Sequence, residues 1–295
     1  MSRLREFASI SALILLLAVA EIILQQPAQL PARPAPQLPR AAPVAKVVQS
    51  VLPPIVVPDS HLPPDAVARA ALPPRRLSVS NQMTGEEFQV ATRLAARVPT
   101  QLAPYFDVFI YVSKAASGPW GQRLFLFHKD SDGSLAYEEK LTVSTGREHS
   151  EQYFTATPAG LFQLDASRFM RMAYSNKWND AQMPFAMFLN YAYRTQMTGV
   201  ALHAAIGARE LADLGSRASG GCVRLPLDKA EILFNRFKSQ ERGTVPVFAF
   251  DEGRGTTNVD GRIVRDTAGR PYTVNGVRVL VLIENYAGEV ATAQL

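Results

Sequence analysis

The chain has 295 residues, of which 47% are hydrophobic and 19% charged, and its formal net charge is +5. This composition is that of an ordinary globular protein with an additional apolar leader. The basic residues are scattered and form no recognised binding motif, which argues against a nucleic-acid partner. The positive charge instead suits an acidic polymer.

The first 26 residues are predicted to be a signal peptide or a membrane anchor. Arg3 and Arg5 precede an apolar run over residues 10–20 that ends in Ala18-Val19-Ala20. A positive segment, an apolar run and small residues at a cleavage site are typical of a signal peptide. Apolar residues resume at 22–24, so the segment can also stay as an inner-membrane anchor. We expect an exported, periplasmic protein that meets the membrane only through this segment.

Residues 27–78 are predicted to be a stiff, extended linker. The range from Pro27 to Pro74 holds 13 of the 21 prolines. Each proline ring fixes φ and removes a backbone donor, so neither helix nor sheet is expected there. Residues 79–105 are predicted as a short helical lead-in, because apolar residues recur at helical spacing over 86–97 and Thr84 is a suitable N-cap.

Residues 106–250 predict a mainly β domain with few helices. Runs rich in β-forming residues, separated by turn signals, lie at 108–112, 123–127, 140–144, 161–164, 200–203, 222–225 and 245–250. An amphipathic helix is expected over 228–238. Residues 251–295 are predicted as a C-terminal extension with a hairpin at 272–284, outside the main domain, because Asn-Gly marks a turn at 275–276.

Cys222 is the single cysteine of the chain. A structural cysteine in an exported protein usually has a disulfide partner, and this one has none within the chain. Two explanations are open: a catalytic nucleophile, or a small buried apolar side chain. One cysteine with one nearby histidine cannot complete a tetrahedral metal site, and no metal motif is present, so we expect neither metal nor other cofactor.

The residues around Cys222 favour the nucleophile. His203 ends a predicted strand before the loop that returns to Cys222, whereas three further histidines are expected in the linker or on the surface: His61, His128 and His149. Gly220 and Gly221 let the backbone turn sharply and direct amides at a substrate oxygen. A thiol beside an imidazole and near two arginines is expected to have a depressed pKa.

Residues 203–225 resemble the active-site segment of the L,D-transpeptidases, the YkuD-like catalytic domain. The shared landmarks are a histidine, Leu214-Gly215 and a Ser-x-Gly-Cys-x-Arg signature at 219–224, preceded by Ser-Thr-Gly at 144–146 and Thr-Pro-x-Gly-x-Phe at 157–162. A closing helix from Asp228 and a Gly-Thr-x-Val strand at 243–246 follow. The resemblance covers about residues 108–250 and implies an L,D-transpeptidase-like β-sandwich with a few helices. Many members have histidine where this chain has Gly220.

The resemblance also implies roles for the residues that match. Cys222 would be the nucleophile and His203 the base, with the amides of Cys222 and Gly221 as oxyanion-hole candidates at a turn that includes Gly220 and is ordered by Ser219. Arg224 would hold the loop or bind a substrate carboxylate, and Arg217 is a second candidate. The alternative for both arginines is a salt bridge to a neighbouring acid. A backbone carbonyl is the expected group that orients His203.

The implied reaction is acyl transfer on peptidoglycan stem peptides. Cys222 would attack the L-centred carbonyl of a tetrapeptide stem, release the terminal D-alanine and form a thioester. An amine would then take the acyl group, giving 3→3 cross-links or related wall remodelling, and carbapenems would be inhibitors. The acceptor is open between a second stem, a lipoprotein, a D-amino acid and water.

Two alternatives remain on the same fold: a hydrolase acting as an L,D-endopeptidase or carboxypeptidase, and a catalytically inactive wall-binding module. The insertion at 169–193 is rich in aromatic and methionine residues. Such residues are usually core, and a lid over the cleft that excludes water is the other interpretation.

Overall fold

The computed structural model describes residues 62–148 and 155–288, which all belong to one compact unit within Leu52–Leu295. The predicted signal or anchor at 1–26, most of the predicted linker, and His61 and His149 lie outside the described residues. Within the described ranges, no helix combines the length and apolar character needed to cross a membrane.

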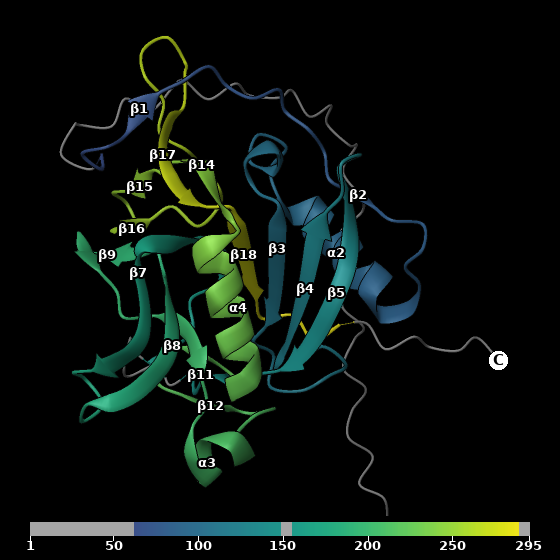
Figure 1. Cartoon of the computed structure of the whole chain (residues 1–295), viewed down its shortest axis with the longest axis vertical. Coiled ribbons are helices and arrows are strands. Elements are labelled where there is room, and N and C mark those ends of the chain that lie inside the picture. Colours follow the sequence, from purple (N-terminus) through teal and green to yellow (C-terminus); the bar gives the residue numbers. More distant parts are fainter. Residues whose placement is uncertain (1–61, 149–154, 289–295) are drawn as a thin grey trace, which may run out of the picture. The chain divides into compact units, whose positions relative to one another are not determined.

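The described chain is mostly strand (Figure 1). The helices are α2 (Gly85–Arg97), α3 (Gly207–Ala212), α4 (Leu227–Ser239) and the short 3-10 helix η2 (Ala103–Tyr105). The strands up to the middle of the chain are β1 (Val67–Ala68), β2 (Ser78–Val79), β3 (Val108–Ser113), β4 (Arg123–Lys129), β5 (Ser134–Thr142), β6 (Thr145–Gly146), β7 (Gly160–Ser175), β8 (Ala181–Leu189) and β9 (Ala192–Tyr193). The others are β10 (Gln196–Met197), β11 (Ala201–Ala204), β12 (Arg217–Ser219), β13 (Val223–Leu225), β14 (Arg242–Pro246), β15 (Phe250–Asp251), β16 (Thr256–Thr257), β17 (Tyr272–Val277) and β18 (Val279–Glu284).

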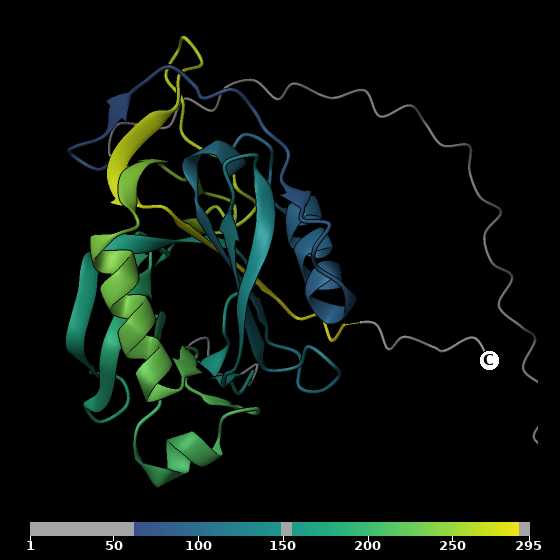
Figure 2. The ribbon, with the colours of Figure 1, turned by 45° about the vertical axis from the view of Figure 1, so that its right-hand side comes forward.

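One nine-stranded sheet organises the molecule, in the order β13-β11-β8-β7-β18-β3-β4-β5-β2. Most neighbours are antiparallel, but three pairs are parallel: β18 with β3, β11 with β13, and β2 with β5. Smaller sheets join β1-β17-β14, β10-β9-β16-β15 and β12-β6. Helix α4 lies between the β7-β8-β11 part of the large sheet and its β3-β4-β5 part (Figures 1 and 2).

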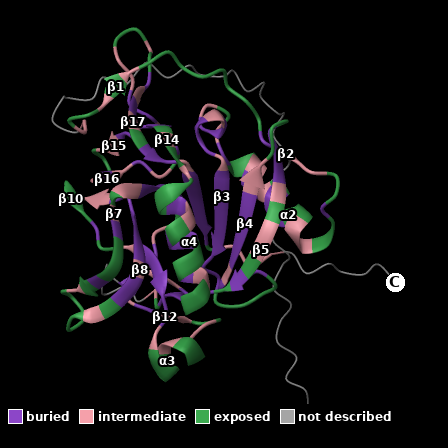
Figure 3. Ribbon diagram, in the orientation of Figure 1, coloured by how far each residue is buried: buried purple, intermediate pink, exposed green. Residues whose placement is uncertain are grey.

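Both faces of the central strands are buried, which explains their nearly continuous apolar sequence. In β3, Val108, Ile110 and Val112 belong to a core shared with α4 and the β7-β8-β11 part of the sheet. Phe109 and Tyr111 alternate with them and pack in a second core with α2. Helix α2 is too short to be stable alone, so it depends on the burial of its apolar stripe (Figure 3).

The predicted mainly β fold with few helices is confirmed. The helices expected at 86–97 and 228–238 are α2 and α4, and Thr84 is at the N-cap position of α2 but makes no side-chain capping hydrogen bond. The predicted hairpin at 272–284 is wrong: β17 pairs with β1 and β14, while β18 pairs with β3 and β7. The apolar residues of β18 are all buried, so this strand completes the centre of the sheet instead of extending it.

The predicted linker also ends earlier than expected. Residues 67–68 and 78–79 are short strands, each at the edge of its sheet. Edge strands use only one side of the backbone for pairing, so neighbouring prolines are tolerated there. Proline density was therefore a poor guide to where the folded part begins.

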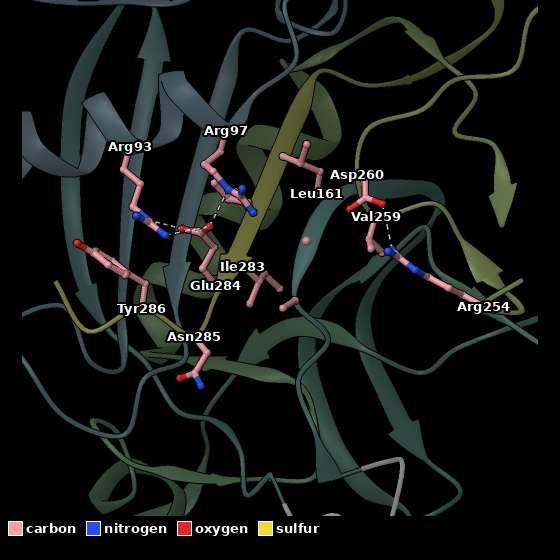
Figure 4. Close-up of a pocket in the computed structure, with 13 residues that line it drawn as sticks. Arg93, Arg97, Leu161, Arg254, Val259, Asp260, Ile283, Glu284, Asn285 and Tyr286 are labelled. Carbon is pink, nitrogen blue, oxygen red and sulfur yellow. Dashed lines mark hydrogen bonds and ion pairs between the residues drawn. The ribbon is translucent and has the colours of Figure 1, made fainter. Parts of the chain in front are cut away.

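Glu284 joins α2 to the end of β18. Arg93 and Arg97 both direct Nε at its carboxylate, at 2.5 and 2.9 Å, and Tyr111 donates its hydroxyl at 3.2 Å. Figure 4 shows the two arginine side chains converging on Glu284. The Glu284 side chain is only 10% exposed, so its charge depends on these partners.

We predict that Glu284→Gln lowers the free energy of unfolding by about 2 kcal/mol, because Arg93 and Arg97 lose their shared counter-ion. Asp260→Asn is the control, since Asp260 and its partner Arg254 are both more than half exposed and such pairs contribute about 0–1 kcal/mol. Urea unfolding of both variants tests this. Equal small effects would contradict it.

Candidate active site

The parallel pairing of β11 with β13 places the chemistry-bearing residues on one face. His203 lies opposite Arg224, and Leu202 lies opposite Val223. Side chains alternate between the faces of a strand, so Leu202 and Val223 enter the main core. A cavity on the other face is lined by His203, Arg224 and Cys222, which precedes Arg224 by two residues.

This cavity has a volume of about 1260 Å³. Its walls come from the β7–β8 hairpin, residues 196–200, and the turn that precedes β13. Five cationic side chains line it (Arg147, Arg168, Lys177, Arg224 and Arg254), against two carboxylates (Glu148 and Glu210). The cavity therefore favours an anionic ligand.

Ser219 orders the turn before Cys222, as predicted from the resemblance. Its Oγ donates to the Cys222 carbonyl at 2.6 Å and accepts from the Gly221 amide at 3.1 Å. Gly221 has φ +123°, a conformation that side chains rarely adopt. The Gly221 N–H is thus engaged within the turn, so the expectation that it belongs to an oxyanion hole is wrong. The amides of Cys222 and Gly220 are left as oxyanion-hole candidates.

Thr157, in the segment before β7, anchors the same turn. Its hydroxyl donates to the Gly221 carbonyl at 2.9 Å and accepts from the Gly146 amide at 2.8 Å. Lys114 donates to the Thr157 carbonyl at 2.6 Å and pairs with Glu148 at 2.9 Å. Sequence reasoning noted the Thr-Pro motif but gave Thr157 no role, because its partners lie 11 and 64 residues away.

His203 is buried and oriented by a backbone carbonyl, as expected. Its Nδ1 lies 2.8 Å from the Ala204 oxygen. A carbonyl only accepts, so Nδ1 carries the hydrogen and Nε2 is left with a lone pair. Burial lowers the pKa of His203 to about 4, because desolvation outweighs the hydrogen bond to Ala204. The ring is neutral at pH 7.

The expected low pKa of Cys222 is wrong. Desolvation raises it to about 11, and it outweighs the Ala201 backbone hydrogen bond and the charge of Arg224, which both lower it. The sulfur packs against an apolar cluster that contains Ala173, Met183 and Phe188. The thiol donates to the Gly199 carbonyl at 3.5 Å, and within the described part of the chain no hydrogen bond joins it to His203.

Arg224 pairs with an acid and also keeps an unused donor. Its Nη2 lies 2.9 Å from Glu210 Oε1, and the second carboxylate oxygen of Glu210 accepts from the Ile206 amide at 3.0 Å. The salt-bridge alternative is therefore present. Arg224 Nε is nevertheless buried, with no hydrogen-bond partner among the described residues. Sequence reasoning missed Glu210, since nothing in the short α3 distinguishes it.

Arg217 does not line the cavity. Its Nε donates to the Lys114 carbonyl and its Nη2 to the Asn285 side chain, both at 2.7 Å. The prediction that it binds substrate is wrong for this cavity. Its partners are a carbonyl and an amide, so the expected salt bridge is not what holds it either. Arg217 ties the strand before the Ser219 turn to the end of β3 and to the residue after β18.

Trp178, near the tip of the β7–β8 hairpin, occupies the space next to Gly220. A Cβ on Gly220 would lie 2.4 Å from the Trp178 Nε1 and 2.7 Å from Cε2. Arg147 lies over the indole at 5.1 Å. A histidine at this position, which the resemblance implies for many family members, would therefore require the Trp178 indole to move.

The insertion at 169–193 contributes to the core and to the cavity wall. Phe169, Met187 and Tyr191 belong to the main core, and Phe169 packs on Phe234 of α4. Three buried residues also line the cavity: Met183, Phe188 and Tyr191. Exposed apolar residues line it as well: Met170, Met172, Tyr174 and Trp178. The core interpretation is thus confirmed for part of the insertion, and the lid stays a prediction.

A second cavity, of about 450 Å³, lies beside Glu284 and holds no nucleophile (Figure 4). Its three arginines have acidic partners, Glu284 or Asp260. Across residues 62–148 and 155–288, no group of three or more His, Cys, Asp or Glu side chains could hold a metal ion. The predicted surface position of His128 is confirmed; it contacts Asp130 and Glu138.

Comparison with known families agrees with this geometry. The family model for the L,D-transpeptidase catalytic domain, YkuD, matches residues 107–260. The match contains every residue of the cavity described above from Arg147 to Val259. No curated protein sequence matches the chain.

The search of solved structures found similarity to L,D-transpeptidases and to a cell shape determining protein. An LD transpeptidase, LdtMt1, in complex with imipenem has 13% identity and a TM-score of 0.35, over 61% of this chain and 59% of that one. An L,D-transpeptidase from Mycobacterium smegmatis has 14% identity and a TM-score of 0.34, over 61% and 59%. The helical cell shape determining protein Pgp2 from Campylobacter jejuni has 16% identity and a TM-score of 0.31, over 60% and 47%. The chain thus spans about half to three-fifths of these structures.

We predict that His203 makes the protein less stable in mild acid. Its pKa is about 4 in the folded state, against an ordinary value of 6.5. Below pH 6.5 the unfolded chain binds a proton that the folded chain does not, so the free energy of unfolding falls by roughly 3 kcal/mol between pH 6.5 and 4. Urea unfolding across this range should show a shallower fall for His203→Gln, and parallel curves would contradict the assignment.

We predict that Gly220→Ala destabilises the protein by about 1–2 kcal/mol, because the new Cβ overlaps the Trp178 indole. In the Trp178→Ala background the same substitution should cost less, since the space is free. A double-mutant cycle measured by urea unfolding isolates this coupling. Additive effects, within about 0.5 kcal/mol, would show that the indole moves aside freely.

Proposed function

The chain belongs to the L,D-transpeptidase catalytic-domain family, and we propose that it is an active enzyme whose nucleophile is Cys222. One observation carries this proposal. A thiol and a histidine with a free Nε2 line one large cationic cavity, and the histidine is held in the required tautomer by Ala204. A wall-binding module would need neither the tautomer nor the half-buried thiol.

The first step is attack by Cys222 Sγ on the L-centred carbonyl of a tetrapeptide stem. The thiol proton passes to His203 Nε2, and the carbonyl π electrons move to the oxygen. Both groups are neutral at rest, because burial raises the pKa of the thiol and lowers that of the imidazole. Proton transfer therefore accompanies attack, with His203 as general base, instead of preceding it as a stable thiolate.

The developing oxyanion needs hydrogen-bond donors that are already in place. The Cys222 amide and the Gly220 amide remain as candidates, since the Gly221 amide is used by Ser219. The contacts from Thr157 and Ser219 hold this turn on both sides. Such support keeps donors oriented without reorganisation during the reaction.

Collapse of the tetrahedral intermediate completes the acyl-enzyme. The C–N bond to the terminal D-alanine breaks, and the His203 imidazolium returns its proton to the leaving amine. A thioester remains on Cys222. An acceptor amine then attacks the thioester, His203 removes its excess proton, and the thiol is restored.

The cavity charge supports a substrate that carries carboxylates. Five cations line the cavity against two acids. The free Nε of Arg224 lies on the same strand face as Cys222, which supports a part in carboxylate binding beside its salt bridge. The excess of positive charge in the cavity suits an anionic stem peptide, which is a component of an acidic polymer.

The β7–β8 hairpin supports transfer over hydrolysis. Tyr174, Trp178 and two methionines present apolar surface to the cavity. Excluding water from a thioester gives an amine acceptor the advantage. The acceptor is proposed to be a second stem, a lipoprotein or a D-amino acid. We further propose that the protein is exported to the periplasm, either cleaved or anchored by residues 1–26.

Intact-mass analysis of the full-length protein tests the nucleophile. With a carbapenem we expect one covalent adduct on wild type and none on Cys222→Ala, because only the thiol forms the thioester. With a disaccharide-tetrapeptide we expect release of D-alanine, reduced by about 10²-fold or more in His203→Gln.

The fate of the thioester separates the alternatives. A labelled D-amino acid incorporated into the product would identify transfer, whereas tripeptide alone would identify the hydrolase. A folded wild type that gives no adduct and releases no D-alanine would favour the inactive wall-binding module, and our proposal would fail.

A further inference from the structure

Two buried polar atoms near Cys222 are unused by the proposed chemistry. Arg168 Nη1 and Thr198 Oγ1 are buried and have no hydrogen-bond partner among the described residues. Both residues line the same cavity as Cys222. An unpaired buried donor costs about 1–3 kcal/mol, and more when it is charged, so each such group in a folded protein calls for an explanation.

The two atoms belong to one local unit. Arg168 Nη2 donates to the Thr198 carbonyl at 2.8 Å, which fixes the guanidinium beside the threonine. The guanidinium also lies 4.1 Å from the centroid of the Phe188 ring. Stacking and the Nη2 bond restrain the Arg168 side chain, so its Nη1 is a preorganised donor.

This unit adjoins the nucleophile. The thiol of Cys222 contacts the carbonyl of Gly199, the residue directly after Thr198. Phe188, which stacks on Arg168, belongs to the cluster on which Cys222 packs. A ligand held by Arg168 and Thr198 is therefore close to the sulfur.

The charge of the unit selects a monoanion. Asp165 is the acid nearest to Arg168 Nη1, at 3.9 Å, which is too long for a hydrogen bond. Asp165 uses Oδ1 to accept from the Ser167 amide and hydroxyl. Arg168 is thus only partly compensated, and burial lowers its pKa. One carboxylate would accept from Nη1 and from the Thr198 hydroxyl and would restore charge balance.

We propose that Arg168 and Thr198 form a carboxylate subsite beside Cys222, which recognises a stem-peptide carboxylate away from the scissile bond. This rests on the proposed function for the identity of the peptide. Arg168 and Thr198 are specificity-determining residues, and they act separately from Arg224, whose guanidinium is held by Glu210.

The test is calorimetric binding of a tetrapeptide to full-length protein carrying Cys222→Ala, which prevents turnover. Arg168→Met and Thr198→Val keep the side-chain volume and remove the donors. Arg171→Met is the matched control, because Arg171 is an exposed arginine of the same strand outside the cavity. We expect Arg168→Met to weaken binding by tenfold or more, Thr198→Val by a smaller factor, and the control to change nothing.

Two amidated peptides identify the carboxylate. One carries an amide at the D-glutamate carboxyl and the other at the diamino-acid side-chain terminus. The peptide that lacks the recognised carboxylate should bind the Cys222→Ala protein about as weakly as the unmodified peptide binds the Arg168→Met variant. Adding Arg168→Met should not weaken the binding of that amidated peptide further. Unchanged affinity of Arg168→Met for the unmodified peptide would overturn the subsite.

A small carboxylate probe tests the subsite independently of whether the protein processes stem peptides. Acetate titrated against protein with ¹⁵N-labelled arginine should shift the Arg168 side-chain signal in a saturable way, and acetamide should not. That result supports the subsite even if the protein does not process stem peptides. No acetate-dependent shift of this signal would overturn it even if D-alanine release is found.

Discussion

The site depends on the parallel pairing of β11 with β13. Because this register sets His203 opposite Arg224, the alternation of side chains sends Leu202 and Val223 to the core and the polar residues to the cavity. A slip of one residue would exchange the two faces. Burial of the apolar partners therefore holds His203 and Cys222 on one face, although they are 19 positions apart in the chain.

Desolvation is the second constraint, and it sets the resting charge state. The cavity removes water from the thiol and the imidazole. Both are neutral as a result, since burial penalises the charged form of each. The charge of Arg224 lowers the pKa of the thiol, but Arg224 is paired with Glu210 and does not outweigh desolvation. Reactivity then depends on the orientation of His203 more than on a preformed thiolate.

The turn that carries Cys222 shows how distant segments combine. Ser219 makes hydrogen bonds within the turn, whereas Thr157 bonds to it from the segment before β7. Lys114 and Glu148 hold Thr157 through its backbone carbonyl and amide. Gly220 leaves room that the Trp178 indole occupies. The hairpin and the turn thus fit each other, and this packing explains the glycine.

The sequence by itself determined the family, the mainly β class, the helices α2 and α4, and the pair Cys222 and His203. The helices and the β class follow from local periodicity, whereas the family and the pair follow from short motifs that occur in a fixed order along the chain. Tertiary structure alone decided the central place of β18, the high pKa of the thiol, and the contacts of Thr157, Glu210, Trp178 and Arg168. Each of these depends on burial or on contacts between residues far apart in the chain, and neither quantity is encoded in the spacing of a motif.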